Sequence, residues 1–219
     1  MILNGISRGL GCYPQDCIVA LFCQLAYFPA MCSERSQRQE QMLSYLEQLS
    51  DTIPGGQPHR IYRNIPELIL DAGRFMPSAP LPSAYSPGEL KACYYNSQVL
   101  ALAHSELTYV EGYAMRDGLS FALPHAWVMA EDGHAIDPTW VDNQGCYLGV
   151  ALETDWLLEL LSDRTARGWP QENAVFDGNH LEQFSFLENG LPSDALAPIN
   201  HLPLVCPQQL RHTEDGRPR

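Results

Sequence analysis

The stretch over 121–141, FALPHAWVMAEDGHAIDPTWV, constrains the fold more than any other part of the sequence. Two runs typical of β-strands flank the turn-forming residues Glu131, Asp132 and Gly133, so the pattern predicts a β-hairpin. A three-residue loop of this kind ends on a left-handed residue, and Gly133 can adopt that conformation without strain. The alternative is a two-residue Asp132-Gly133 turn, which shifts the strand pairing by one residue.

The length of that loop decides which side chains share a face of the hairpin. With three loop residues, Asp137 lies opposite Trp127, on the face that also carries His125. Asp137 and His125 are then diagonal neighbours within side-chain reach of each other. The two-residue turn would place Asp137 on the other face. A working His125–Asp137 pair therefore predicts the three-residue loop.

Cys93 precedes the hairpin in the segment KACYYNSQVLALAHSELTYVEGYAM. Residues 90–104 follow a helical pattern, and LTYVEGYAM after them has strand character. A cysteine becomes a good nucleophile when an imidazole or a helix N-terminus stabilises its thiolate, and the imidazole in turn needs a carboxylate to orient it. Cys93, His125 and Asp137 are therefore a candidate nucleophile, base and orienting acid.

The order of these residues resembles the transglutaminase-like branch of the papain-like cysteine protease superfamily. The resemblance rests on a cysteine at a helix start, a YVEGYA strand, HAW on the next strand and DPTW on the one after, and it covers roughly Lys91 to Tyr147. The same layout recurs in small uncharacterised bacterial and phage proteins. The resemblance implies an α+β fold with a papain-like, transglutaminase-like core, in which a catalytic helix packs on an antiparallel sheet and extra helices precede it.

The same resemblance implies a catalytic triad of Cys93 as nucleophile, His125 as base and Asp137 as orienting acid. The activities found in the family include amide hydrolysis, deamidation, acyl transfer to amines and peptide cleavage. Trp127 and Trp140 are expected to be core residues or walls of the substrate pocket.

Two features depart from the family pattern. The run Ser86–Glu89 (SPGE) is a capping-box sequence that would start the helix early and put Cys93 in its second turn, so we expect a break near Lys91 that lets the helix begin afresh. In addition, no upstream glutamine is placed to complete an oxyanion hole beside the backbone N–H of Cys93. Tyr85 or Asn96 could supply the second donor, although Asn96 is equally consistent with a polar residue of the helix.

Cys17 is a rival nucleophile. The segment PQDCIVALF also places a cysteine at a predicted helix start, behind a glutamine and an aspartate, as in some NlpC/P60-type and papain-type enzymes. No histidine-bearing strand follows soon after it, because His59 lies in the turn-like GGQPHRIY. The sequence therefore favours Cys93.

Charge and cysteine content restrict the partners. The net charge of the 219 residues is −13, from 13 basic and 26 acidic side chains, which argues against binding nucleic acid or an anionic membrane surface. The chain has 7 cysteines but no C-x-x-C pair, and its histidines and acidic residues lack metal-binding spacing, so we expect no metal and no cofactor. The expected substrate is a protein, a peptide or a small amide.

The remaining organisation follows from hydrophobic patterning. The apolar CIVALFCQLAYFPAMC is interrupted by Gln24 and Pro29 and lacks a basic leader, so we expect a buried helix, reduced cysteines and a cytoplasmic protein. Residues 1–190 are expected to form one transglutaminase-like domain. Its parts are a helical region over 1–75, a catalytic core over 85–150 and a helix over 153–168, and a Pro-rich irregular tail follows over 191–219.

These features predict a cysteine-dependent acyl-transfer enzyme that cleaves or deamidates an amide bond through an acyl-thioester. The alternative is an acidic interaction protein, phage-derived in origin, that keeps the fold without catalysis.

Overall fold

The structure, a computed structural model, describes residues 37–54, 59–142, 145–170, 174–176 and 181–198. The chain divides into two compact units, Met1–Arg38 and Gln39–Arg219, and the fold below is that of the second. The expected N-terminal apolar helix and Cys17 lie outside the described residues. None of the helices in the described ranges is long and apolar enough to cross a membrane.

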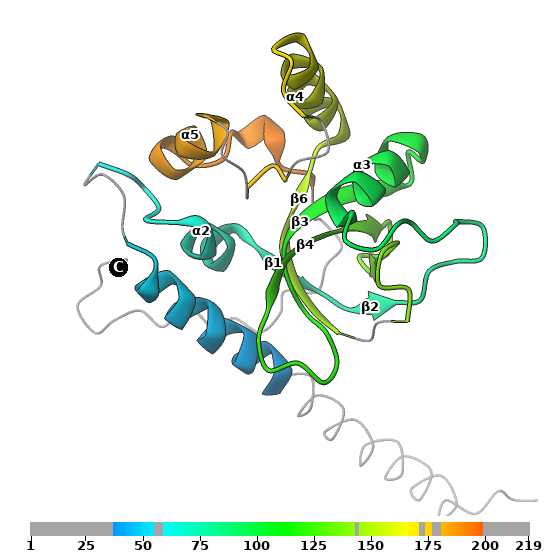
Figure 1. Cartoon of the computed structure of the whole chain (residues 1–219), viewed down its shortest axis with the longest axis horizontal. Helices are drawn as coiled ribbons and strands as arrows, with labels where there is room; N and C mark the ends of the chain where they lie inside the picture. The colour runs from blue at the N-terminus through cyan, green and yellow to red at the C-terminus, as the bar shows by residue number, and fades with distance from the viewer. Residues whose placement is uncertain (1–36, 55–58, 143–144, 171–173, 177–180, 199–219) are drawn as a thin grey trace, which may run out of the picture. The chain divides into compact units, whose positions relative to one another are not determined.

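The second unit is a mixed α+β fold built on one six-stranded sheet (Figure 1). In chain order the strands are β1 (Arg74–Met76), β2 (Ser78–Ala79), β3 (Leu107–Met115), β4 (Leu123–Ala130), β5 (Ala135–Ile136) and β6 (Cys146–Leu152). In space their order is β1-β6-β3-β4-β5-β2. Neighbouring strands are antiparallel except β2 and β5, which are parallel, so the sheet is mixed where the sequence predicted an antiparallel one.

The sheet is nearly closed on itself. Its two edge strands, β1 and β2, follow each other in the chain with only Pro77 between them, so both edges of the sheet meet at this residue. The carbonyl of Pro77 accepts a hydrogen bond of 2.8 Å from the N–H of Ala135 on β5. Closure of this kind gives the strands an inner and an outer face with alternating side chains.

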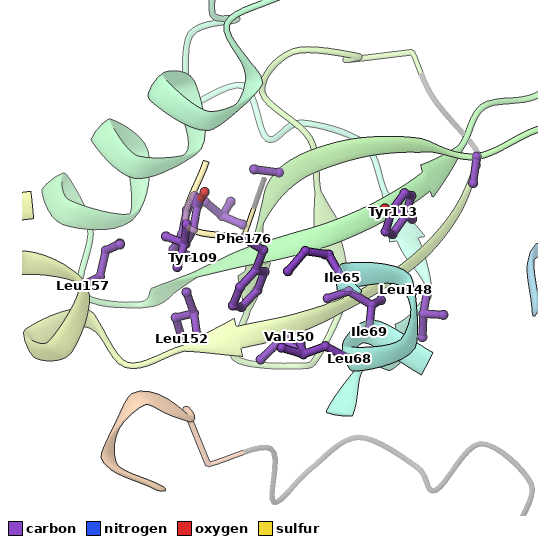
Figure 2. Packing of buried hydrophobic residues seen from close by; sticks show 14 of the residues in the cluster. Ile65, Leu68, Ile69, Tyr109, Tyr113, Leu148, Val150, Leu152, Leu157 and Phe176 are labelled. Atoms are coloured by element: carbon purple, nitrogen blue, oxygen red, sulfur yellow. The ribbon is translucent and has the colours of Figure 1, made fainter. Parts of the chain in front are cut away.

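The outer face is covered by helices. They are a helix that includes residues 39–52, α2 (Ile65–Ala72), α3 (Cys93–Ala103), α4 (Thr154–Ala166) and α5 (Leu181–Asn189). Figure 2 shows Leu68 and Ile69 of α2 against Val150 and Leu148 of β6, within one buried apolar cluster. Burial of such side chains, at about 25 cal/mol per Å² of apolar surface, is the main stabilising contribution to a fold of this size.

Helix α2 lies within the helical region that the sequence predicted over 1–75. The side chain of Asn64 caps it by accepting a hydrogen bond from the N–H of Glu67, Pro66 occupies its first turn, and Gly73 ends it. Each of these is a helix boundary signal that can be seen in sequence. Helix α4 forms within the expected range 153–168, but it begins at Thr154 without a side-chain cap.

The inner face of the curved sheet holds a second buried cluster. Trp127 of β4 and Tyr147 of β6 have ring centroids 5.0 Å apart, although β3 lies between their strands. Both rings belong to one buried cluster, and the Trp127 ring lies against Gly149 of β6. The indole N–H of Trp127 donates to Met76 Sδ at 3.3 Å, and Trp127 itself is fully buried.

Part of the segment expected to be an irregular tail is ordered against the sheet. Ser193–Ala195 form a 3-10 helix, and Leu196 makes a β-bridge with Leu152 at the end of β6. Residues 199–219 lie outside the described ranges.

Candidate active site

The hairpin of β4 and β5 positions a histidine and an aspartate on one face. Val128 pairs with Ile136 and Met129 with Ala135, and Gly133 has a positive φ of 84°. This register confirms the three-residue loop that the sequence predicted. It places Asp137, the residue after β5, diagonally across from His125 on β4.

Asp137 is held by the turn that it begins. Its Oδ1 accepts hydrogen bonds from the backbone N–H groups of Thr139 (2.8 Å) and Trp140 (2.9 Å). Its Oδ2 accepts from the hydroxyl of Tyr147 at 2.9 Å. An aspartate that accepts from the backbone two and three residues ahead is a common turn arrangement, so DPTW fixes the position of its own carboxylate.

His125 is buried against that carboxylate. Its Nε2 lies 2.7 Å from Asp137 Oδ2, and the side chain of the histidine is 3% exposed. The ring of Trp140 stacks on the imidazole with centroids 3.8 Å apart and an interplanar angle of 11°. One face of the imidazole is therefore covered by an indole, and its orientation is fixed from two directions.

Cys93 is the first residue of α3. The chain before it does not continue a helix from Ser86–Glu89, because Lys91 has a positive φ of 69°, which interrupts any helical run. The predicted break near Lys91 is confirmed, and it puts Cys93 in the first turn. At that position the backbone N–H groups have no intrahelical acceptors, and the helix dipole favours negative charge.

Cys93 lies near enough to the imidazole of His125 to help raise the pKa of that ring. Since Nε2 of the ring faces Asp137, Nδ1 is the nitrogen left for the sulfur. Cys93 is half-buried, whereas the histidine and the aspartate are buried, so the sulfur is the member of the row that solvent can reach. Cys93 on α3, His125 on β4 and Asp137 in the turn after β5 thus lie next to one another, with His125 in the middle.

His125 and Asp137 are both charged at neutral pH. Burial lowers the pKa of His125, but hydrogen bonds and charge interactions with Asp137 and Cys93 outweigh burial and raise the pKa to about 9. Burial raises the pKa of Asp137, but the hydrogen bond and charge of His125, together with the two backbone N–H groups, outweigh it, so the carboxylate pKa lies below its ordinary range. The buried pair is therefore an imidazolium and a carboxylate.

The side chains expected to complete an oxyanion hole are engaged elsewhere. The amide of Asn96 donates to the carbonyl of Glu89 (2.7 Å) and to Thr139 Oγ1 (2.9 Å). The hydroxyl of Tyr85 donates to Glu106 Oε1 at 3.0 Å.

The ring of Tyr85 packs on His104, which follows the last residue of α3. At 1.5 Å per residue, the length of α3 separates Tyr85 from Cys93 by about 16 Å. The structure therefore does not bring Tyr85 to the triad.

The two tryptophans differ in their distance from the imidazole. Trp140 is half-buried and stacks directly on His125. Trp127 is fully buried on the inner face of the sheet, with its ring centroid 6.4 Å from that of His125. Trp127 is therefore a core residue, and Trp140 is the tryptophan that adjoins both the imidazole and solvent.

Tyr147 and Thr139 are members of the site that sequence reasoning missed. Thr139 lies inside DPTW, but its contact with Asn96 joins residues far apart in the chain and has no local signal. Tyr147 meets Asp137 although β3 and β4 lie between β6 and β5 in the sheet, so the contact depends on the curvature and packing of the whole sheet. Both contacts depend on tertiary structure, so a single sequence does not reveal them.

No metal site accompanies these groups in the described part of the chain, where no three His, Cys, Asp or Glu side chains are arranged to hold an ion. The rival Cys17 is outside the described residues, and His59 is exposed.

In comparisons with known proteins, no family model, no curated protein and no solved structure matches this chain.

Proposed function

We propose that the protein is a cysteine-dependent acyl-transfer enzyme with a papain-like core of the transglutaminase-like kind. The observation that supports the proposal most is the row of Cys93, His125 and Asp137. His125 is hydrogen-bonded to Asp137, Cys93 acts on the pKa of the imidazole, and Cys93 is half-buried whereas the other two residues are buried. A protonated imidazole beside a cysteine is the arrangement that stabilises a thiolate at neutral pH.

In the first half of the reaction, the thiolate of Cys93 attacks the carbonyl carbon of an amide or ester. The carbonyl oxygen becomes an oxyanion, which the backbone N–H of Cys93 can stabilise from the first position of α3. Collapse of this intermediate breaks the C–N or C–O bond, and the imidazolium of His125 gives its proton to the departing amine or alcohol. The products are a free amine or alcohol and an acyl-thioester on the sulfur.

In the second half, the neutral imidazole of His125 takes a proton from water, and the resulting hydroxide equivalent attacks the thioester. The C–S bond breaks, a carboxylic acid leaves, and the thiolate–imidazolium pair is restored. An amine in place of water would give a new amide. Water is the default acceptor, so hydrolysis or deamidation of an amide is the favoured outcome.

Asp137 and Trp140 would act on the imidazole in this scheme. The carboxylate stabilises the positive ring and fixes which nitrogen faces the sulfur. The indole covers one face of that ring and keeps water from the imidazole–carboxylate contact. Neither side chain needs to touch the substrate to do so.

Acyl-enzyme trapping tests the proposal. The full chain is incubated at pH 6 with p-nitrophenyl acetate, quenched in acid, digested and mapped by mass spectrometry. An ordinary cysteine with a pKa of about 8.5 is almost entirely protonated at that pH, so we expect the acetyl group chiefly on Cys93. The adduct should be absent in Cys93→Ala and retained in Cys146→Ala, which removes the other half-buried thiol of the described residues.

Two results would count against this assignment. Acetylation chiefly on Cys17 would show that Cys17, and not Cys93, is the nucleophile. Equal, slow acetylation of Cys93 and Cys146 would leave an acidic, non-catalytic interaction protein as the better description.

A further inference from the structure

A chain of buried hydrogen bonds joins the nucleophile helix to the turn that carries the acid. Asn96 lies one turn after Cys93 on α3, and its Nδ2 donates to Thr139 Oγ1 at 2.9 Å. Thr139 in turn donates its backbone N–H to Asp137 Oδ1 at 2.8 Å. Asp137 is hydrogen-bonded to His125, whose imidazole lies beside Cys93, so the connection returns to the start of the same helix and closes a ring.

The two linking residues are buried, as the acid and base of the proposed triad are. Asn96 is 9% exposed and Thr139 is 5% exposed. At such depth a lost hydrogen bond is not replaced by water without cost, and a buried polar group left unpaired costs about 1–3 kcal/mol. The link is therefore maintained whenever the protein is folded.

The hydrogen bonds of Asn96 hold this end of α3, since they join it to Thr139 and to the carbonyl of Glu89. Ser97 and Gln98 are also buried in its first two turns, but Ser97 Oγ has no hydrogen-bond partner among the described residues, and Tyr95 and Val99 are exposed. Apolar packing tolerates small sliding movements, but a hydrogen bond weakens steeply with distance and angle. The position of the helix start along its axis is consequently set by directional bonds.

The loop before Cys93 is attached to the same turn. The N–H of Gly88 donates to the carbonyl of Pro138 at 2.8 Å, and the amide of Asn96 also binds the carbonyl of Glu89. A Cβ at position 88 would lie 2.2 Å from Cγ of Asn96, so only glycine fits there. These contacts hold Lys91 in a left-handed conformation that costs a non-glycine residue about 1–2 kcal/mol.

We propose that Asn96 and Thr139 are positioning residues that set the separation between the sulfur of Cys93 and the imidazole of His125. This inference rests on the proposed function, because it supposes that the sulfur–imidazole contact is used in catalysis. Neither residue touches the reacting atoms. A misplacement of about 1 Å at a reacting centre lowers rates by about 100-fold, so a small shift of α3 has a large consequence.

The test compares two substitutions of one residue. Thr139→Val keeps the shape of the side chain and removes the hydroxyl, whereas Thr139→Ser keeps the hydroxyl and removes the methyl group. The readout is the rate of alkylation of Cys93 by iodoacetamide from pH 5 to pH 10, followed by peptide mapping at a temperature where circular dichroism shows each variant folded. Gln98→Leu, a buried polar substitution on the same helix outside the ring, is the control.

We expect Thr139→Val to lower the pH 6 alkylation rate of Cys93 by about 10- to 100-fold, in line with a small misplacement. Thr139→Ser should stay within about threefold of wild type, and Gln98→Leu should lose stability without losing reactivity. Asn96→Ala combined with Thr139→Val should be no slower than the slower single variant, because both break one link. If Thr139→Val fails to fold, Asn96→Ala removes the same hydrogen bond from the other side, and the alkylation rate of Cys93 is measured in that variant.

The outcomes separate the two proposals. A fast wild-type Cys93 whose rate and pH profile survive Thr139→Val, or fall equally in Thr139→Ser, overturns the positioning role alone. A wild-type Cys93 that reacts no faster than Cys146 overturns the proposed function, and the positioning role with it.

Discussion

Two buried carboxylates in this protein have almost the same partners and opposite electrostatics. Asp137, at the hairpin, accepts from two backbone N–H groups and the hydroxyl of Tyr147. Glu111, on β3, accepts from the backbone N–H groups of Val175 and Phe176 and from the hydroxyl of Tyr109. Yet the pKa of Asp137 is lowered, and the pKa of Glu111 is raised.

The remaining partner explains the difference. Burial raises the pKa of Glu111, and neither its hydrogen bonds nor the charge of fully buried Arg164 offsets this. Asp137 has the imidazole of His125 in direct contact at 2.7 Å, which overcomes the cost of burial. A titratable cation at hydrogen-bond distance stabilises a buried carboxylate more than a positive charge that only acts at longer range.

The two carboxylates also differ in the groups to which their hydrogen bonds lead. Glu111 ties β3 to the segment 174–176 and so leads further into the protein. Asp137 leads through His125 to Cys93, which is half-buried and open to solvent. The comparison teaches that a satisfied buried carboxylate is a structural feature by default, and that it becomes a candidate for chemistry when it is linked to an accessible nucleophile.

Replacing the proposed base, His125, should have the largest effect. His125→Gln keeps an N–H donor toward Asp137 but cannot carry the positive charge that stabilises a thiolate. We expect the pH 6 alkylation rate of Cys93 by iodoacetamide to fall by about 100-fold or more, the usual scale for loss of an acid–base partner. Circular dichroism should show a folded protein. An unchanged rate would contradict the statement that the Asp137 cluster, unlike the Glu111 cluster, controls the reactivity of Cys93.

Replacing the structural carboxylate should affect stability and not reactivity. In Glu111→Gln, the amide NH₂ faces a backbone N–H and leaves a buried donor unpaired, so we expect a loss of about 1–3 kcal/mol of unfolding free energy. Urea denaturation measures this loss. Alkylation of Cys93, corrected for the folded fraction, should remain at the wild-type rate, and a large decrease would show that the two clusters are coupled.

The two tyrosines offer a matched pair. Tyr147→Phe and Tyr109→Phe each remove one hydroxyl from a buried carboxylate, at a cost of about 1 kcal/mol in stability. Only Tyr147→Phe should change the site: without the hydroxyl, Asp137 binds the imidazolium more strongly, so the pKa of His125 rises. NMR titration of the His125 ring measures this shift, and an equal response to Tyr109→Phe would contradict the comparison.

The charged histidine should also appear in the pH dependence of stability. A histidine pKa that is raised in the folded state stabilises the fold fully below the unfolded value of 6.5, and this contribution is lost as the pH rises through about 9. We expect the urea midpoint of wild type to decrease as the pH is raised from 6.5 to about 9. His125→Gln should show a flatter profile over the same window, and parallel profiles would rule out the shifted pKa.

Local chemistry made the hairpin and the boundaries of α2 predictable. The turn residues up to Gly133 mark the hairpin, and Asn64, Pro66 and Gly73 mark α2, each within a few positions of the feature. The three-residue length of the loop and the break near Lys91 were not local predictions. They followed from requiring a His125–Asp137 pair and a Cys93 in the first turn of its helix, and the structure shows both features.

Closure of the sheet could not be read in the same way. It depends on β1 and β2, which are three and two residues long and have no pattern of their own. The pairing of Tyr147 with Asp137, and of segment 174–176 with Glu111, then follows from closure and packing. Tertiary contacts select these residues, and the sequence near them does not mark them.

The pH–rate profile of Cys93 alkylation tests most directly whether sulfur, imidazole and carboxylate work as one unit. Iodoacetamide reacts with the full chain from pH 5 to pH 10, and peptide mapping follows Cys93 separately from the other thiols. We expect Cys93 to react rapidly already at pH 6, with a second step near pH 9, where His125 loses its proton. A single rise centred on the ordinary cysteine pKa of about 8.5, unaffected by His125→Gln, would contradict the account.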